Sequence, residues 1–118
     1  MTKLWIPGKP VPKERPRCTC PGKQKPLVFT PKRTYAYERH VATTWAEGSL
    51  GAGPIDCPFA AHVEMNSEGA WVTITPLPER TFKLRGDSDN YVKSLIDGLQ
   101  GVAFTDDINM VELTAKKW

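Results

Sequence analysis

The chain has 118 residues, which suits one domain, and its composition is that of an ordinary soluble globular protein. No apolar run is long enough to span a bilayer, no leader-like segment opens the sequence, and three cysteines argue against a disulfide framework, so we expect a cytoplasmic protein. The net charge of +3 is uneven: residues 1–40 carry +8, residues 41–80 carry −4 and residues 81–118 carry −1. This uneven charge suits a protein that binds a polyanion and brings cations to the bound polyanion. A mixed-charge surface also explains the uneven charge.

The first segment combines a short apolar run, Leu4 to Ile6, with a proline-rich basic stretch that follows it. Prolines at positions 7, 10, 12 and 16 exclude a helix and a central strand, so we expect an edge strand that leads into an extended basic segment. Extended chain with alternating cations suits a phosphate backbone, and a solvated loop explains the residues equally well.

A short strand-like run, Leu27 to Phe29, precedes a predicted helix. Thr30 is a suitable N-cap, Pro31 suits the first turn, and Gly48 suits the end of the helix. Apolar residues recur every four positions and predict a buried face, formed by Tyr37, Val41 and Trp45.

Residues 59–65 alternate between apolar and polar side chains, which predicts a half-buried strand with Phe59, Ala61, Val63 and Met65 on its apolar side. The letters NSEG indicate a turn, and AWVTITPL predicts a second strand. The two strands form a predicted hairpin.

Five aspartates lie within residues 85–107, and a second helix is predicted to begin among them, at about Asp89. Its apolar face is predicted to hold Tyr91, Leu95 and Leu99, with Val92 and Ile96 beside them, and Gly101 is predicted to end it. Residues 102–104 are strand-like, and residues 111–116 alternate as a strand with one polar face.

Asp87 and Asp89 lie two residues apart before this helix, so their carboxylates can face one point. With Asp107 they would form part of a shell for a divalent cation, because Mg²⁺ takes a few carboxylates and keeps several waters. Lys93 can neutralise the acids or stabilise charge that develops on a phosphate. An ordinary helix cap explains Asp89 well and Asp87 partly, so a capped surface helix stays open as an alternative. A zinc site at Cys18, Cys20 and Cys57 is disfavoured by the one-residue spacing of the first two.

The acidic stretch that contains Asp87, Asp89, Lys93 and Asp107 resembles the RusA family of Holliday junction resolvases. The similarity comprises Asp87-Ser88-Asp89-Asn90, Lys93, Asp97-Gly98-Leu99 and Asp106-Asp107, and the stretches IPGKPVPKERPR and TPKRTYAYE also resemble family members. The resemblance implies an α+β fold in a single domain over residues 1–118, with a small mixed β-sheet and two main helices. It also implies a homodimer that binds four-way DNA junctions and makes paired nicks with Mg²⁺, for which Mn²⁺ can substitute.

Carried over residue by residue, the resemblance makes Asp87, Asp89 and Asp107 the metal ligands and Lys93 the catalytic lysine. Asn90, Asp97 and Asp106 would support the site. The cations expected to hold DNA are Lys9, Lys13, Arg15, Arg17, Lys23, Lys25, Lys32 and Arg33. Two alternatives stay open: a non-catalytic module that binds branched DNA, and a structural oligomer whose acids only cap a helix.

Overall fold

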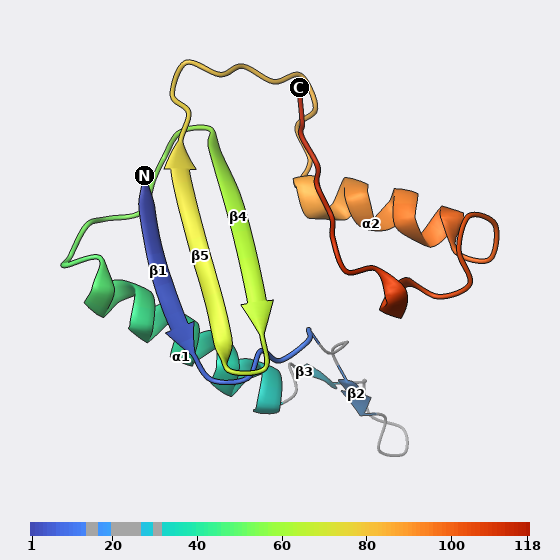
Figure 1. Cartoon of the computed structure of the whole chain (residues 1–118), viewed down its shortest axis with the longest axis horizontal. Helices are drawn as coiled ribbons and strands as arrows, with labels where there is room; N and C mark the ends of the chain where they lie inside the picture. The colour runs from blue at the N-terminus through green and yellow to red at the C-terminus, as the bar shows by residue number, and fades with distance from the viewer. Residues whose placement is uncertain (14–16, 20–26, 30–31) are drawn as a thin grey trace. The chain divides into compact units, whose positions relative to one another are not determined.

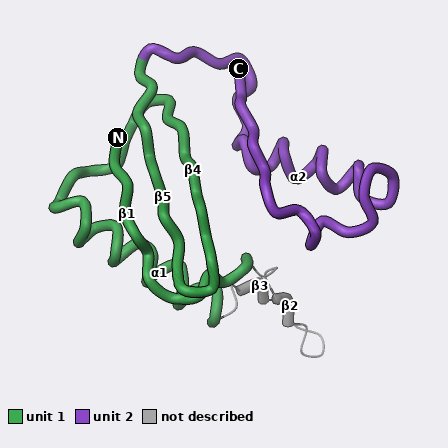
Figure 2. The backbone as a smooth tube through the Cα atoms, viewed as in Figure 1, with its two compact units in different colours: residues 1–78 green, residues 79–118 purple. Residues whose placement is uncertain are grey.

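The computed structural model describes residues 1–13, 17–19, 27–29 and 32–118. The backbone forms two compact units, Met1–Pro78 (unit 1) and Glu79–Trp118 (unit 2), which are coloured separately in Figure 2 and are described one at a time. The single domain expected over residues 1–118 stays a prediction. No helix in the described part of the chain is long and apolar enough to cross a membrane.

Unit 1 contains a three-stranded antiparallel sheet with the strand order β1-β5-β4 (Figure 1). Its strands are β1 (Thr2–Pro7), β4 (Phe59–Asn66) and β5 (Gly69–Pro76). Strands β4 and β5 form the predicted hairpin, and β1 lies at an edge of the sheet, as the prolines of the first segment predicted. The Asn66 side-chain oxygen closes the hairpin turn, because it accepts hydrogen bonds from the backbone N–H groups of Glu68 (2.8 Å) and Gly69 (3.1 Å).

Helix α1 (Lys32–Gly48) packs against β1. The Leu4 side chain lies against Gly48, where a Cβ would be 3.0 Å from its methyl groups, and the His40 ring Nε2 donates to the Pro7 carbonyl at 2.5 Å. Ile6, only 1% exposed, is the most deeply buried large side chain of the described residues. The predicted apolar stripe is confirmed, because Tyr37, Val41 and Trp45 are all half-buried. The predicted N-cap and first-turn proline, at positions 30 and 31, lie outside the described residues.

Strand β4 differs from the prediction, because every one of its residues is exposed. Phe59, Val63 and Met65 do alternate with polar residues, but they are 54%, 49% and 69% exposed. The physical reason is position: α1 packs on β1, and β4 lies at the opposite edge of the sheet.

A second, two-stranded antiparallel sheet joins β2 (Arg17–Thr19) to β3 (Leu27–Phe29). The strand-like run at residues 27–29 is therefore confirmed. Among the named strands of the described residues every pairing is antiparallel, so the α+β class is confirmed, while the mixed pairing that was expected is not observed there.

Unit 2 contains helix α2 (Ser88–Leu99) and a single 3-10 turn, η1 (Asp107–Asn109). Two predicted strands are wrong. Residues 102–104 form a turn with one isolated bridge, between Gln100 and Phe104, and residues 111–116 are extended without strand pairing. A strand needs a hydrogen-bonded neighbour, and unit 2 holds no sheet that could supply one.

Candidate active site

Asp87 occupies the N-cap position of α2, with the extended backbone angles φ −65° and ψ 136°. Its carbonyl accepts hydrogen bonds from the backbone N–H groups of Asn90 (3.2 Å) and Tyr91 (3.3 Å), whereas its carboxylate makes no capping hydrogen bond. The cap alternative therefore fails to account for the Asp87 side chain, which is exposed. Asp89 lies in the first turn, where the helix dipole favours a negative charge.

Gly86, directly before Asp87, is fixed through both of its backbone polar groups. Its N–H donates to the Tyr91 hydroxyl at 3.1 Å, and its carbonyl accepts from the Lys117 Nζ at 3.0 Å. A Cβ at this position would lie 2.9 Å from the Tyr91 hydroxyl oxygen, so a larger residue would force the Tyr91 side chain to shift. These contacts fix the path of the chain into the acidic end of α2.

Helix α2 exposes much of the face that was predicted to be buried. Tyr91, Leu95 and Leu99 are exposed, Leu95 by 69%, while Val92 and Ile96 are half-buried. The expectation of a covered face is wrong because η1 is the only other helix or strand described in unit 2, and one turn cannot cover a three-turn helix. Gly101 does follow the helix end as predicted, and its φ of 86° is one that glycine adopts without strain.

Asp106 and Asp107 have different local roles. The Asp106 Oδ1 accepts a hydrogen bond from the Ile108 N–H at 3.0 Å and caps η1, so this carboxylate shapes the turn. Asp107 is the first residue of η1 and is exposed, as are Lys93, Asn90 and Asp97 on α2. The supporting hydrogen bonds expected of Asn90 and Asp97 stay a prediction.

The carboxylates have the right chemistry for Mg²⁺, which prefers oxygen ligands. Their placement does not complete a site: within the described residues, no three His, Cys, Asp or Glu side chains lie close enough together to hold a metal ion. Asp87 and Asp89 share the start of α2, but Asp107 does not join them in such a group. The described arrangement thus presents two exposed carboxylates at the start of α2 and an exposed lysine about one turn further along the helix.

The structure describes some of the cations that were expected to hold DNA. Lys9, Lys32 and Arg33 are exposed, the latter two in the first turn of α1. Lys13 forms an ion pair with Glu38, which neutralises part of its charge. Arg17 lies in β2, and Arg15, Lys23 and Lys25 lie outside the described residues.

Sequence reasoning missed a second group of cations, in unit 2. Arg80, Arg85 and Lys117 lie over the rings of Trp118 and Phe82, beside Gly86. The basic character of residues 79–86 was visible in the sequence, but no local pattern indicates that Lys117 and Trp118 lie against them.

The chain combines an α+β fold, two exposed carboxylates at the start of α2 with a lysine about one turn further on, and a strongly basic first third, which suits a protein that acts on a nucleic acid. A family model described as endodeoxyribonuclease RusA matches residues 7–118, nearly the whole chain. The protein therefore belongs to the RusA family of endodeoxyribonucleases. No curated protein and no solved structure gave a significant match.

Proposed function

We propose that this protein is a structure-selective endodeoxyribonuclease that resolves four-way DNA junctions by paired, symmetric nicks. The observation that carries the proposal is the RusA family match over residues 7–118. It is supported by the exposure of Asp87 and Asp89 at the start of α2 and of Lys93 about one turn further on, where a phosphodiester can approach them.

The chain's own residues suit two parts of this chemistry. Lys93 lies about one turn beyond Asp89 on α2, and its ammonium group would stabilise negative charge that develops on the phosphate. Gly86, held by Tyr91 and Lys117, would keep Asp87 at a fixed place relative to that lysine. Well-positioned groups of this kind lower the barrier because little reorganisation is left to the reacting state.

We propose Asp87, Asp89 and Asp107 as ligands of Mg²⁺, with Mn²⁺ as a substitute, on the basis of the motif and the oxygen chemistry of the three side chains. Because the three do not converge in the described structure, metal binding is tested directly. We expect wild-type protein to bind Mn²⁺ in a spectroscopic titration, and Asp87→Asn and Asp89→Asn each to weaken that binding at least tenfold.

We further propose that the protein acts as a homodimer. A two-fold symmetric protein matches the near two-fold symmetry of a four-way junction, and two copies would place one acidic site on each of two opposed strands. Sedimentation of the free protein and of its junction complex tests this assignment.

The first experiment incubates a labelled synthetic four-way junction with wild-type protein or Asp89→Asn, in Mg²⁺ or in chelator. We expect paired nicks only with wild-type protein in Mg²⁺. Asp89→Asn should bind the junction at least as tightly, because the substitution removes a negative charge that faces the phosphates. Tight junction binding without nicks in Mg²⁺ or Mn²⁺ would instead identify a non-catalytic module for branched DNA.

A further inference from the structure

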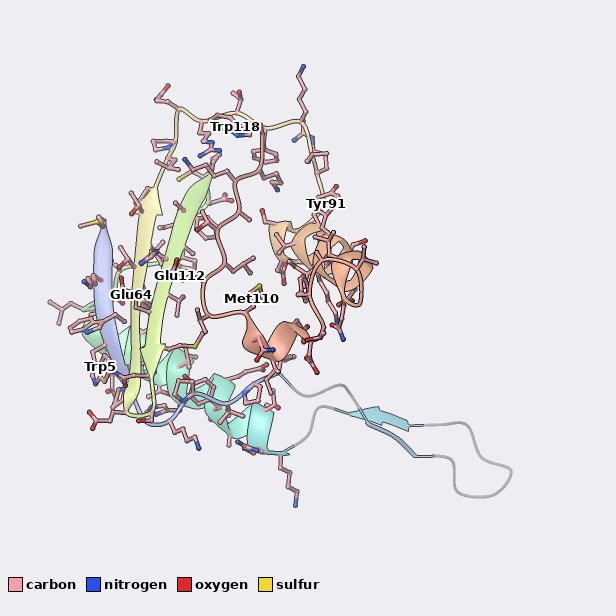
Figure 3. All side chains as sticks on the ribbon, turned by 45° about the vertical axis from the view of Figure 1, so that its right-hand side comes forward. Trp5, Glu64, Tyr91, Met110, Glu112 and Trp118 are labelled. Carbon is pink, nitrogen blue, oxygen red and sulfur yellow. The ribbon has the colours of Figure 1, made fainter. Side chains whose placement is uncertain are left out.

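Residues 80–86 lie directly before helix α2, and hydrogen bonds join them to residues 117–118, which are far away in the sequence. Arg80 donates from its guanidinium to the Lys117 carbonyl at 3.2 Å, and the Leu84 N–H donates to the Trp118 carbonyl at 3.3 Å. Lys117 in turn donates to the Gly86 carbonyl at 3.0 Å. Residues 80–86 and 117–118 therefore form one surface, labelled at Trp118 in Figure 3.

Cations and aromatic rings alternate on this surface. The Arg80 guanidinium lies 3.7 Å from the centre of the Trp118 ring, and the Lys117 ammonium lies 4.4 Å from the centre of the Phe82 ring. Arg85 lies 5.4 Å from the same Phe82 ring. We call these five residues the cationic clasp.

Part of the clasp holds unit 2 together, and part of it is exposed to solvent. Arg80 and Lys117 are half-buried and make the hydrogen bonds above, so their role in holding the two segments together is established by their contacts. Trp118, by contrast, is 67% exposed, and Arg80 can cover only one face of its ring. Arg85, with Lys83 and Lys116 beside the clasp, is also exposed.

An exposed indole among cations has the chemistry of a surface for single-stranded nucleic acid. Bases stack on aromatic rings without regard to sequence, and Lys and Arg neutralise the phosphates between them. An indole that carries a guanidinium on one face still offers the other face to a base. In residues 79–86 the single acid, Glu79, is outnumbered by Arg80, Lys83 and Arg85.

We propose that the cationic clasp binds an unpaired or unstacked stretch of DNA strand, with Trp118 stacking on a base and Arg85, Lys83 and Lys116 on the phosphates. Gly86 joins the clasp to Asp87, so the bound strand would enter the acidic end of α2 from this side. The inference rests on the proposed function, because it assigns a strand-binding role to the surface that adjoins the proposed nuclease site.

The test measures binding of a fluorescein-labelled oligothymidylate by anisotropy, in chelator so that nothing is cut. Trp118→Ala should weaken binding about tenfold, the magnitude of one base–aromatic stack, and Trp118→Phe should recover most of the loss. Arg85→Ala should make the negative slope of log affinity against log salt shallower by about 0.7, the value for one single-strand phosphate contact. Lys3→Ala is the matched control, because Lys3 also lies over a tryptophan, Trp71, at 5.1 Å, but belongs to unit 1; it removes one cation without touching the clasp and should change both quantities less than the clasp variants do.

A second measurement uses wild-type protein and therefore does not depend on whether Trp118→Ala folds. Wild-type protein is crosslinked to an oligonucleotide that contains 5-bromodeoxyuridine, and the attached residue is found by mass spectrometry; we expect Trp118. A folded Trp118→Ala variant with unchanged affinity, or a crosslink confined to other residues, would overturn the proposal. Junction cleavage without these effects would leave the proposed function standing, whereas the effects without any cleavage would overturn the function and keep the clasp.

Discussion

At the scale of single residues, Gly86 links the cationic clasp to the proposed catalytic end of α2. Gly86→Ala would place a methyl group 2.9 Å from the Tyr91 hydroxyl oxygen, so the ring must move away and lose its hydrogen bond from the Gly86 N–H. We expect the free energy of unfolding to fall by about 1 kcal/mol, the net value of one hydrogen bond, and junction cleavage to fall with it. Urea denaturation and initial cleavage rates measure the two effects.

Two further variants separate the causes. Tyr91→Phe removes the same hydrogen bond without the steric clash and should reproduce the loss of stability. Gly98→Ala lies within α2, where an added Cβ meets open space, and should instead stabilise the protein by up to about 1 kcal/mol. If Gly86→Ala unfolded like the wild type, the contact between Gly86 and Tyr91 would not exist in solution.

Another residue-scale prediction concerns the open face of the sheet. His62 donates from Nε2 to the Glu64 Oε1 at 3.0 Å, and this hydrogen bond lowers the pKa of Glu64, with smaller contributions from the charges of His62 and Lys3. A lowered folded pKa stabilises the protein above the ordinary glutamate pKa, and the contribution is lost as the pH falls through the lowered value. Both side chains are at least 70% exposed, so the contribution is small.

An NMR titration of Glu64 checks this assignment. We expect the pKa of Glu64 to lie below the ordinary glutamate value in wild-type protein and to return toward it in His62→Ala. Lys3→Ala should raise the pKa less, because Lys3 is the weakest of the causes. An unchanged pKa in His62→Ala would show that the hydrogen bond does not form in solution.

At the scale of elements, the β4–β5 hairpin depends on a glycine beside a tryptophan. A Cβ at Gly69 would lie 2.5 Å from the Ile6 carbonyl oxygen and would also strike the Trp5 indole, so backbone as well as side chain would have to shift. Gly69→Ala should therefore lower the free energy of unfolding by about 1–3 kcal/mol, the usual cost of overpacking. Gly53→Ala, where a Cβ meets nothing within 4 Å, is the matched control and should differ little from wild type. Equal stability of the two variants would contradict the strand register of β1 and β5.

Local sequence patterns predicted the elements whose turn, repeat and end signals all lie within one short stretch of the chain. The hairpin carries its own turn signal in Asn66 to Gly69, and α1 and α2 carry apolar repeats and end signals. The strand expected at residues 111–116 was wrong, because alternation shows only that a segment can pair and not that a partner is present. The buried side of β4 was wrong for a related reason, since burial depends on what covers the strand.

In the candidate site, too, local patterns predicted some features, and others depend on contacts between distant residues. Asp87, Asp89 and Lys93 lie within a span of seven residues, so a helix boundary predicted from the sequence was enough to assign all three to the first half of α2 and its N-cap. Asp107 lies on the far side of the loop that follows α2, and its distance from the pair depends on a fold that periodicity does not encode. The clasp contacts join residues 31 and 37 positions apart, which is why no motif revealed them.

At the scale of the whole molecule, the charges divide between the units. Unit 1 has ten Lys and Arg against six Asp and Glu, a net charge of +4, and unit 2 has six against seven, a net charge of −1. Since the acids of unit 2 repel a phosphate backbone, most of the long-range attraction for DNA must come from unit 1. The proposed role of the clasp cations is confined to short range, where they outnumber the acids.

This division predicts how junction affinity responds to salt and to single cations. If about six phosphates are neutralised, log affinity should fall against log salt with a slope near −5, measured by anisotropy in chelator. Lys9→Ala should make this slope shallower by about 0.9, whereas Lys13→Ala should change it less, because Lys13 is already paired with Glu38. Glu38→Gln frees that lysine and should tighten junction binding. A slope close to zero would show that the basic first third does not contact DNA, and equal effects of Lys9→Ala and Lys13→Ala would show that the pair with Glu38 opens when DNA binds.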